Sequence, residues 1–243
     1  MSPLALEPTE LVPAPAAGRV FEVALQPALA DVIGDGREGR ARLDAIARWI
    51  QDVAYADFVA AGFEGRGAWV VRRTRLRIES FPRFGEQLAL RTFCSGIGRF
   101  CAERRTTIAG PGAAVETVAL WVCLDASTWR PMRLDDDFIA AYGESAAGRK
   151  ASFRLRHPEP PDGAERGEWR FRASDLDLAG HINNAHYWDV LEERLAGGQP
   201  AVIDAEIEYR APAQPGPAVV LSEGDALWVA GIDEIVHASI LRW

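Results

Sequence analysis

The chain has 243 residues, of which 48% are hydrophobic and 26% are charged, and its formal net charge is −8. This composition is typical of a folded globular protein and argues against a largely disordered chain. A negative net charge also argues against a general nucleic-acid-binding protein, which needs positive charge to displace the counterions of phosphates. No apolar run reaches the length of a membrane helix, and the N-terminus does not resemble a secretion signal. The sequence therefore predicts a cytoplasmic protein without membrane insertion or nucleic-acid partners.

The cysteines and histidines do not form the pattern of a metal site. The chain has three cysteines, Cys94, Cys101 and Cys123. They show no metal-ligand spacing and cannot all pair with one another, so we interpret them as reduced structural thiols. His186 follows His181 by five residues, which puts the two on different faces of a helix, and His157 and His237 have no visible partners. We expect no bound metal and no cofactor.

The first half of the chain predicts a strand, a helix and four further strands. Residues 19–26 alternate like a strand, and a stretch rich in Gly and Asp follows them. From Leu43 to about Ala61 apolar residues recur every three or four positions, which predicts an amphipathic helix that ends at Gly62. Strand-like runs then cover residues 69–80, 88–97, 99–108 and 115–125, and a short helical segment falls within residues 131–143.

The second half repeats this order. A connection rich in Gly, Pro and charge spans residues 143–167, and we expect a boundary there. The predicted parts are a flexible segment at 1–18, a first unit at 19–145, a linker at 146–166 and a second unit at 167–243. The second unit predicts a strand at 168–175, a helix with an apolar face, and strands at 201–212, 217–224, 226–232 and 234–243. The apolar face of that helix contains Ile182, Ala185, Trp188, Leu191 and Leu195, and "GGQP" should end the helix.

The repeated order predicts a duplicated α+β unit. One helix among several antiparallel strands can bury its apolar side only against one face of a curved sheet. Two such units can extend one sheet or pack face to face, and either arrangement covers exposed edges.

Arginines alternate along the strand predicted at 69–80. Arg73, Arg75 and Arg77 fall on one of its two faces. Two interpretations stay open for this face: a solvated side of the sheet, or a docking surface for an acidic partner.

A cluster of polar residues precedes the helix of the second half. Its members are Asp175, Asp177, Gly180, His181, Asn183 and Asn184. The first turn of a helix leaves backbone N–H groups unpaired and partly positive, which suits an oxyanion. Asp177 could orient a water as general base or attack as a nucleophile, and His181 could donate a hydrogen bond or hold a substrate.

Other interpretations of this cluster stay open on the residues alone. Asp175 or Asp177 could be a helix N-cap, and Asn183 and Asn184 could lie on the wet side of the helix. Capping needs only one short polar side chain, and Asn is a weak helix former, so the cluster favours a functional role. The same groups could also add or remove water across a double bond. A serine nucleophile and a dinucleotide site are set aside, because no G-x-S-x-G is present and no G-x-G-x-x-G follows a strand.

The stretch from Asp175 to Tyr187 resembles the D-x-D-x-x-G-H-x-N-N-x-x-Y signature of hotdog-fold thioesterases. In the first half, "AWVVRRTRLRIESFPRFGEQLALRTF" and "ETVALWVCLDASTWRPMRL" resemble the N-terminal hotdog of acyl-[acyl carrier protein] thioesterases of the plant and bacterial type. The similarity runs from about Val20 to Trp243. It implies a tandem hotdog, in which each unit is an antiparallel curved sheet wrapped around one central helix.

The resemblance implies hydrolysis of fatty acyl thioesters on acyl carrier protein, which ends chain elongation and releases free acid. The family's catalytic aspartate and histidine fall on Asp177 and His181. The Gly180 and His181 amides would bind the oxyanion, with Asn183 in support and Asn184 toward the substrate. The first hotdog has residues 40–43, "RARL", where a catalytic helix start would need His and Asn, so we expect it to bind the acyl chain without catalysing.

The chain departs from the family pattern at two places. The asparagine between the catalytic aspartate and histidine is replaced by Ala179, and the Glu and Cys of the following strand are replaced by residues within Ala211-Pro212-Ala213. Two polar catalytic groups are therefore absent. A non-catalytic acyl-binding hotdog is accordingly one alternative function, and an acyl-CoA thioesterase or an enoyl hydratase of the same superfamily is another.

By analogy with the family, the first hotdog should line the acyl tunnel. The candidates for setting chain length are Trp49, Ile50, Val53 and Trp69. An acidic carrier protein would also be steered by local positive charge, which favours docking at the arginine face described above. The sequence does not determine the length of the acyl chain or whether the acyl group is carried by acyl carrier protein or by coenzyme A. It does not determine the oligomeric state either, and a homodimer stays open.

Overall fold

The computed structural model describes residues 6–34, 39–195 and 202–243. The first half contains β1 (Val20–Leu25), β2 (Val32–Ile33), β3 (Arg40–Ala41), α1 (Leu43–Ala60), β4 (Ala68–Ser80), β5 (Leu88–Ile97), β6 (Cys101–Ala109), β7 (Ala114–Leu124) and α2 (Asp136–Ala146). The second half contains β8 (Glu165–Phe171), α3 (Tyr187–Leu195), β9 (Ile203–Tyr209), β10 (Gly216–Glu223), β11 (Ala226–Gly231) and β12 (Val236–Arg242). Among the described residues, no helix is both long and apolar enough to cross a membrane.

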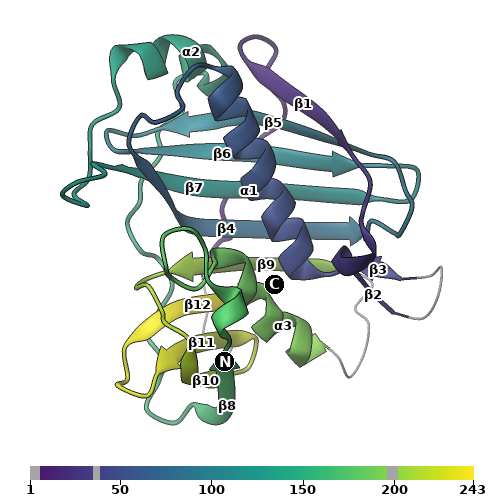
Figure 1. The fold of residues 1–243 in the computed structure, drawn as a ribbon, viewed down its shortest axis with the longest axis vertical. Coiled ribbons are helices and arrows are strands. Elements are labelled where there is room, and N and C mark those ends of the chain that lie inside the picture. Colours follow the sequence, from purple (N-terminus) through teal and green to yellow (C-terminus); the bar gives the residue numbers. More distant parts are fainter. Residues whose placement is uncertain (1–5, 35–38, 196–201) are drawn as a thin grey trace.

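The strands form one 10-stranded antiparallel sheet in the order β1-β5-β6-β7-β4-β9-β12-β11-β10-β8 (Figure 1). Leaving the short β2–β3 pair aside, each half has its first strand at the outer edge, followed by its third, fourth, fifth and second strands. The halves meet where β4 pairs with β9. This repeated order confirms the duplicated α+β unit, and it shows that the two units extend one sheet.

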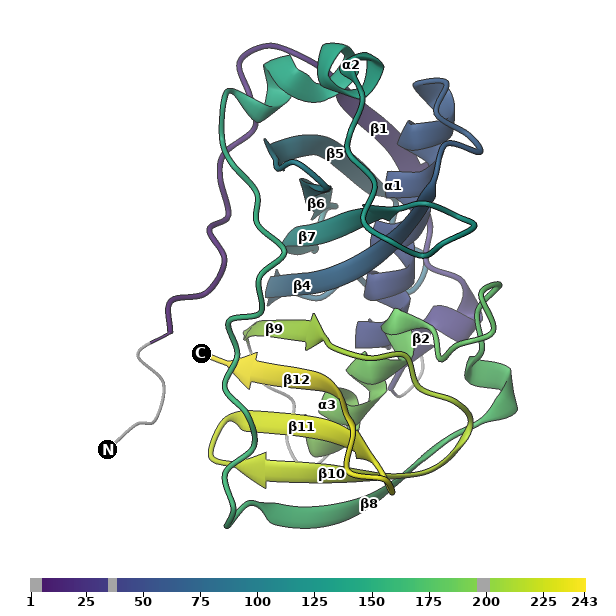
Figure 2. The ribbon, with the colours of Figure 1, turned by 90° about the vertical axis from the view of Figure 1, so that its left-hand side faces the viewer.

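Helices α1 and α3 lie on the same side of the sheet (Figures 1 and 2). Ile46 and Ile50 of α1 are buried against the sheet, as the three-and-four spacing predicts. Trp188 and Leu191 of α3 belong to the same apolar cluster as those α1 residues. The two halves therefore share one core and are not separate bodies joined by a linker.

Two irregular segments cover the other side of the sheet. Figure 2 shows the N-terminal segment and the connection from α2 to β8 running along this outer face. Arg75 donates to the carbonyl oxygen of Thr9 at 2.5 Å, and the Nε of Arg105 donates to that of Val12 at 2.9 Å. Thr9 and Val12, in the segment where the composition predicts flexibility, are thus bonded to the sheet.

The outer face is charged where the two halves meet. In the β4–β9 register, Arg73 stands opposite Glu208, Arg75 opposite Glu206, and Arg77 opposite Asp204. Arg73 lies 2.8 Å from Glu208, and Arg75 lies 2.6 Å from Asp204. Alternating arginines on one strand therefore meet alternating acids on another, and this complementarity favours a single register.

Both interpretations of the arginine face are wrong for Arg73 and Arg75. Their side chains are only 6% and 8% exposed, because the N-terminal segment and the connection cover them. Arg77 is exposed and lies 3.1 Å from Glu79. Only Arg77 of this set is accessible to a partner protein.

His157, which shows no visible partner in the sequence, joins this charged network. Its ring nitrogens lie 3.1 Å from the Ser239 hydroxyl and 3.2 Å from a carboxylate oxygen of Glu206. Burial by itself would raise the pKa of Glu206, but hydrogen bonds from His157 and Thr9 and the charge of Arg73 hold that pKa below its ordinary value. Glu206 is therefore a buried carboxylate that remains charged.

Candidate active site at the junction of the two halves

Asp177 organises the loop between β8 and α3. Its carboxylate oxygen Oδ1 accepts the backbone N–H of Ala179 at 2.8 Å and that of His181 at 3.2 Å. Its carbonyl oxygen accepts the N–H of Gly180 at 3.1 Å. Gly180 has φ +77°, a left-handed conformation that favours glycine, although a Cβ there would meet no atom within 4 Å. The glycine is therefore needed for backbone conformation and not for space.

The helix begins later than predicted from the apolar face, which includes Ile182. Helical structure begins with the 3₁₀ turn Asn184–His186 and continues as α3, so Gly180 and His181 lie in the preceding loop. Their amides are not the unpaired donors of a first helical turn, because Asp177 already accepts both. The early glycine and the Asp177 turn delay the helix until Asn183 can cap it.

Asp175 and Asn183 hold the two ends of this loop. Asp175 is buried, and its carboxylate accepts the backbone N–H of Arg172 at 2.7 Å. Asn183 donates its own N–H to the Asp175 carbonyl, and its Oδ1 accepts the N–H of Ala185 at 2.9 Å. The N-cap of the helical segment is therefore Asn183, not Asp175 or Asp177, and the Asp175 side chain instead closes the preceding 3₁₀ turn Ala173–Asp175.

The side chains left open to chemistry belong to Asp177 and His181. Both are half-buried, and within the described residues neither Oδ2 of Asp177 nor the ring of His181 has a hydrogen-bond partner. The side chain of Asn184 is also half-buried, while its carbonyl accepts the Tyr209 hydroxyl at 3.0 Å. The structure therefore brings the predicted catalytic pair together on one loop.

The substituted family positions lie beside the same loop. Ile182 donates its N–H to the carbonyl of Ala213 at 3.0 Å, and Gln214 donates to the carbonyl of Gly180 at 3.0 Å. The polar side chains that the family has at the positions of Ala179, Pro212 and Ala213 are therefore absent at or beside the loop.

That loop also contacts the first half of the chain. Helix α1 packs against α3 and against the 3₁₀ turn before it. Gln51 of α1 donates from Nε2 to Oδ1 of Asn183 at 3.4 Å. The candidate site thus lies where the two units meet, a position that neither unit could form alone.

A cavity of about 280 Å³ opens in the first half between α1 and the sheet. Its lining is apolar and strongly aromatic, with side chains from α1, β4, β7 and α2. The aromatic residues in the lining are Tyr55, Phe58, Trp69, Trp121, Phe138 and Tyr142. An apolar cavity of this kind suits the hydrocarbon part of a ligand.

Of the four chain-length candidates, only Trp69 lines the cavity. Trp49, Ile50 and Val53 are at most 4% exposed and lie in the shared core, where they do not line this cavity. The helical spacing that marks them as buried cannot distinguish a core contact from a cavity wall. The other aromatic residues of the lining that lie on strands and on α2 are Trp121, Phe138 and Tyr142, for which the sequence carried no ligand signal.

A buried ion pair closes part of the cavity wall. Arg104, which lines the cavity, hydrogen-bonds to Asp57 of α1, and Arg19 donates to the same carboxylate at 2.6 Å. Burial raises the pKa of the Tyr142 hydroxyl to about 12 and that of the Cys94 thiol to about 11. Both groups are therefore protonated at neutral pH, and Cys94 is unsuited to act as a nucleophile.

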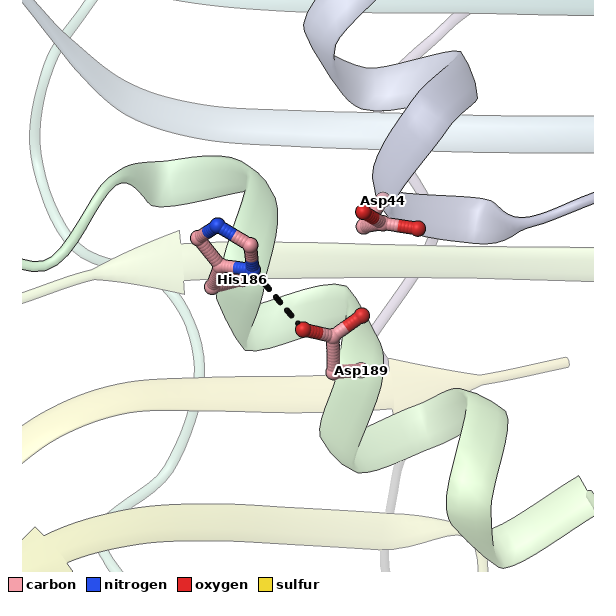
Figure 3. A group of neighbouring side chains, drawn as sticks. All are labelled: Asp44, His186 and Asp189. Atoms are coloured by element: carbon pink, nitrogen blue, oxygen red, sulfur yellow. Dashed lines mark hydrogen bonds and ion pairs between the residues drawn. The ribbon is translucent and has the colours of Figure 1, made fainter. Parts of the chain in front are cut away.

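A second polar group lies between α1 and the start of α3 (Figure 3). His186 lies 2.8 Å from Asp189, and one donor atom each of Asp44, His186 and Asp189 lies within 4.8 Å of the others. Asp44 is already paired with two arginines, Arg42 and Arg48, whose positive charges oppose the binding of a cation. We interpret the group as a His186–Asp189 contact within the second half that lies beside Asp44 of the first half.

This contact predicts a pH-dependent stability. The hydrogen bond to Asp189 raises the pKa of His186 above its ordinary 6.5, burial opposes this, and the charges of Asp189, Asp175 and Asp44 add to it. The stabilisation is complete below about pH 6.5 and is lost as pH rises through the folded pKa. Between about pH 6 and pH 8 the wild type should lose about 0.5 kcal/mol that Asp189→Asn does not lose. Urea unfolding at both pH values would measure this, and equal losses in the two proteins would contradict it.

Both halves match family models of known proteins. Residues 31–142 match the acyl-ACP thioesterase N-terminal domain, and residues 159–235 match the acyl-ACP thioesterase C-terminal domain. An uncharacterized protein of Mycobacterium tuberculosis is 27% identical over 242 residues, covering 96% of this chain and 95% of that protein.

Solved structures share the fold at low sequence identity. An acyl-ACP thioesterase from Bacteroides thetaiotaomicron superposes with a TM-score of 0.73 and 15% identity, covering 92% of this chain and 96% of that one. A 12:0-ACP thioesterase from Umbellularia californica superposes with a TM-score of 0.69 and 18% identity, covering 92% of this chain and 96% of that one.

The fold is a tandem hotdog, and the matched domain models define a thioesterase. Because the two family models together match most of the chain, it belongs to the acyl-ACP thioesterase family. The predicted resemblance, fold class and enzyme class are therefore confirmed. The family hydrolyses the thioester that joins a fatty acyl group to acyl carrier protein.

Proposed function

We propose that the chain binds the acyl group of a fatty acyl-ACP in the aromatic cavity and hydrolyses the thioester at the loop of Asp177. The observation that carries this assignment is the position of the loop against α1. Ala54 and Tyr55 of α1 line the cavity, and Gln51, one helical turn earlier, contacts the loop through Asn183. One ligand can therefore extend from the cavity to the catalytic pair.

Asp177 acts on the attacking oxygen in this scheme. Its Oδ1 is fixed by two backbone amides, which leaves Oδ2 to accept a proton from water or to attack the carbonyl carbon directly. His181, on the same loop, donates a hydrogen bond to the thioester or to the leaving sulfur. No metal or cofactor takes part, and acyl carrier protein is the partner that delivers the substrate.

The test is free-thiol release from acyl-ACPs of several chain lengths, with the matching acyl-CoAs run in parallel. Turnover of acyl-ACP with a defined optimum in chain length would support the assignment. A preference for the CoA esters would instead identify coenzyme A as the carrier of the acyl group. Folded protein without turnover would favour the acyl-binding alternative, which Ala179, Pro212 and Ala213 motivate. A reversible change in enoyl absorbance without thiol release would indicate a hydratase.

The cavity predicts how the chain-length preference can be changed. Ala102 lines the cavity, so Ala102→Leu should reduce the cavity volume. The preferred acyl chain should become shorter by about two carbons or more. The kcat on this shorter chain should be largely kept. Ala140→Leu, on the exposed side of α2, is the matched control and should leave the optimum unchanged. An unchanged optimum in Ala102→Leu would mean that the acyl chain binds elsewhere.

Two further assignments stay predictions. The three cysteines are free and buried, which is consistent with the cytoplasmic location that we propose. A homodimer stays open, and a sedimentation measurement would decide between it and a monomer.

A further inference from the structure

The backbone amides of the loop leave the candidate site short of hydrogen-bond donors for the thioester carbonyl, because the His181 ring is the donor assigned to it so far. Hydrolysis puts negative charge on the carbonyl oxygen of the thioester, and donors aimed at that oxygen lower the barrier. The amides of Gly180 and His181 are already bonded to Asp177, and positions 179 and 213 carry only alanine methyl groups. A donor from another element would therefore add to the hydrogen bond that His181 provides.

Gln51 of α1 is placed to be this donor. It is half-buried at the junction, and its amide carries two N–H bonds, of which one reaches Oδ1 of Asn183 at 3.4 Å. Asn183 Oδ1 already accepts the N–H of Ala185 at the shorter distance of 2.9 Å. The contact with Gln51 is thus a long second bond, and Gln51 can exchange it for a substrate oxygen without leaving the Asn183 cap unsatisfied.

The position of Gln51 along α1 matches the path of the ligand. Residues three and four positions apart share one side of a helix, so Gln51 lies on the same side as Ala54 and Tyr55 of the cavity wall. An acyl chain in the cavity that reaches the loop must therefore bring its carbonyl group past Gln51.

We propose that Gln51 donates an Nε2–H hydrogen bond to the thioester carbonyl oxygen and stabilises the oxyanion, an inference that rests on the proposed function. Water attacks the carbonyl carbon, its proton goes to Asp177, and the C=O π electrons move to the oxygen held by Gln51. Collapse of the tetrahedral intermediate re-forms the C=O bond and breaks the C–S bond. The proton then passes to the departing thiolate, which leaves as a free thiol.

The experiment compares Gln51→Ala and Gln51→Glu with Asp52→Asn, an exposed neighbour on the same helix, on the best acyl-ACP substrate. Gln51→Ala should lower kcat by about 10²–10³-fold with a KM change of less than about threefold. Gln51→Glu, which replaces the donor by a negative charge, should lose at least as much. Asp52→Asn should keep kcat within about twofold, and all three proteins should keep the wild-type circular dichroism spectrum.

A double-variant comparison separates a direct role from one exerted through Asn183. If Gln51 only positions Asn183, then Gln51→Ala should cost nothing further in an Asn183→Ala background, and this result would overturn the proposal. A kcat for Gln51→Ala within about threefold of wild type would also overturn it. Absence of wild-type turnover would overturn the proposed function together with this inference, whereas wild-type turnover with an unaffected Gln51→Ala would overturn the inference alone.

Discussion

Asp177→Asn should lower kcat by about 10²–10⁴-fold while the protein remains folded. The substitution is isosteric, and the amide oxygen can still accept the backbone N–H groups of Ala179 and His181 that hold the loop. What is lost is the negative oxygen, which takes the proton of water or attacks the carbonyl. Thiol release under saturating acyl-ACP measures the effect.

Asp175→Asn is the matched control for this experiment. Asp175 lies two residues away, and its carboxylate is used for capping, with bonds to the backbone and the side chain of Arg172. We expect a loss of about 1 kcal/mol in stability and a change of less than about threefold in kcat. If Asp177→Asn retains turnover at the level of Asp175→Asn, then Asp177 is a structural residue and the catalytic assignment is wrong.

Arg73→Met should lower the free energy of unfolding by about 3–5 kcal/mol, because it leaves a buried carboxylate without its partner. Glu206 and Glu208 have side chains that are 0% exposed, and Arg73 lies 3.6 Å from the first and 2.8 Å from the second. Methionine fills a similar volume, so the effect is mainly electrostatic. Urea unfolding monitored by tryptophan fluorescence measures it.

Arg77→Met provides the control on the same strand and the same face. Its side chain is 46% exposed, and its loss should cost no more than about 0.5 kcal/mol. The double variant Arg73→Met with Glu208→Gln should recover part of the loss, because the unpaired charge is removed along with its partner. Equal losses in Arg73→Met and Arg77→Met would show that the buried network does not hold the two halves together.

Much of the fold follows from local patterns in the sequence. The three-and-four spacing after Leu43 predicts α1 almost to the residue, and alternation predicts β5 over Leu88–Ile97. These patterns are reliable because the period of the apolar residues must equal the period of the backbone that buries them. The repeated order of elements likewise predicts the duplication, since each unit has to bury one helix against one sheet.

One part of the candidate site follows from a local sequence motif, and the other part follows only from the tertiary structure. Asp177, Gly180 and His181 are close in sequence, so a local motif suffices to bring them onto one loop. Gln51 lies 132 residues from Asn183 in the chain and carries no motif of its own. Its proximity to the loop exists only because β4 pairs with β9 and thereby brings α1 beside α3.

The sequence by itself determined the elements, their duplication and the candidate catalytic loop, because these depend on residues that are neighbours along the chain. The tertiary structure decided what covers each face. The alternation places Arg73 and Arg75 on one face of their strand but does not reveal what covers that face. It is covered by the N-terminal segment and neighboured by a distant strand that carries acids at 204, 206 and 208. The spacing that marks Ile50 and Val53 as buried does not reveal whether side chains or a cavity lie opposite them. Periodicity reports only the direction in which a side chain points, and the packing of distant segments determines what it contacts.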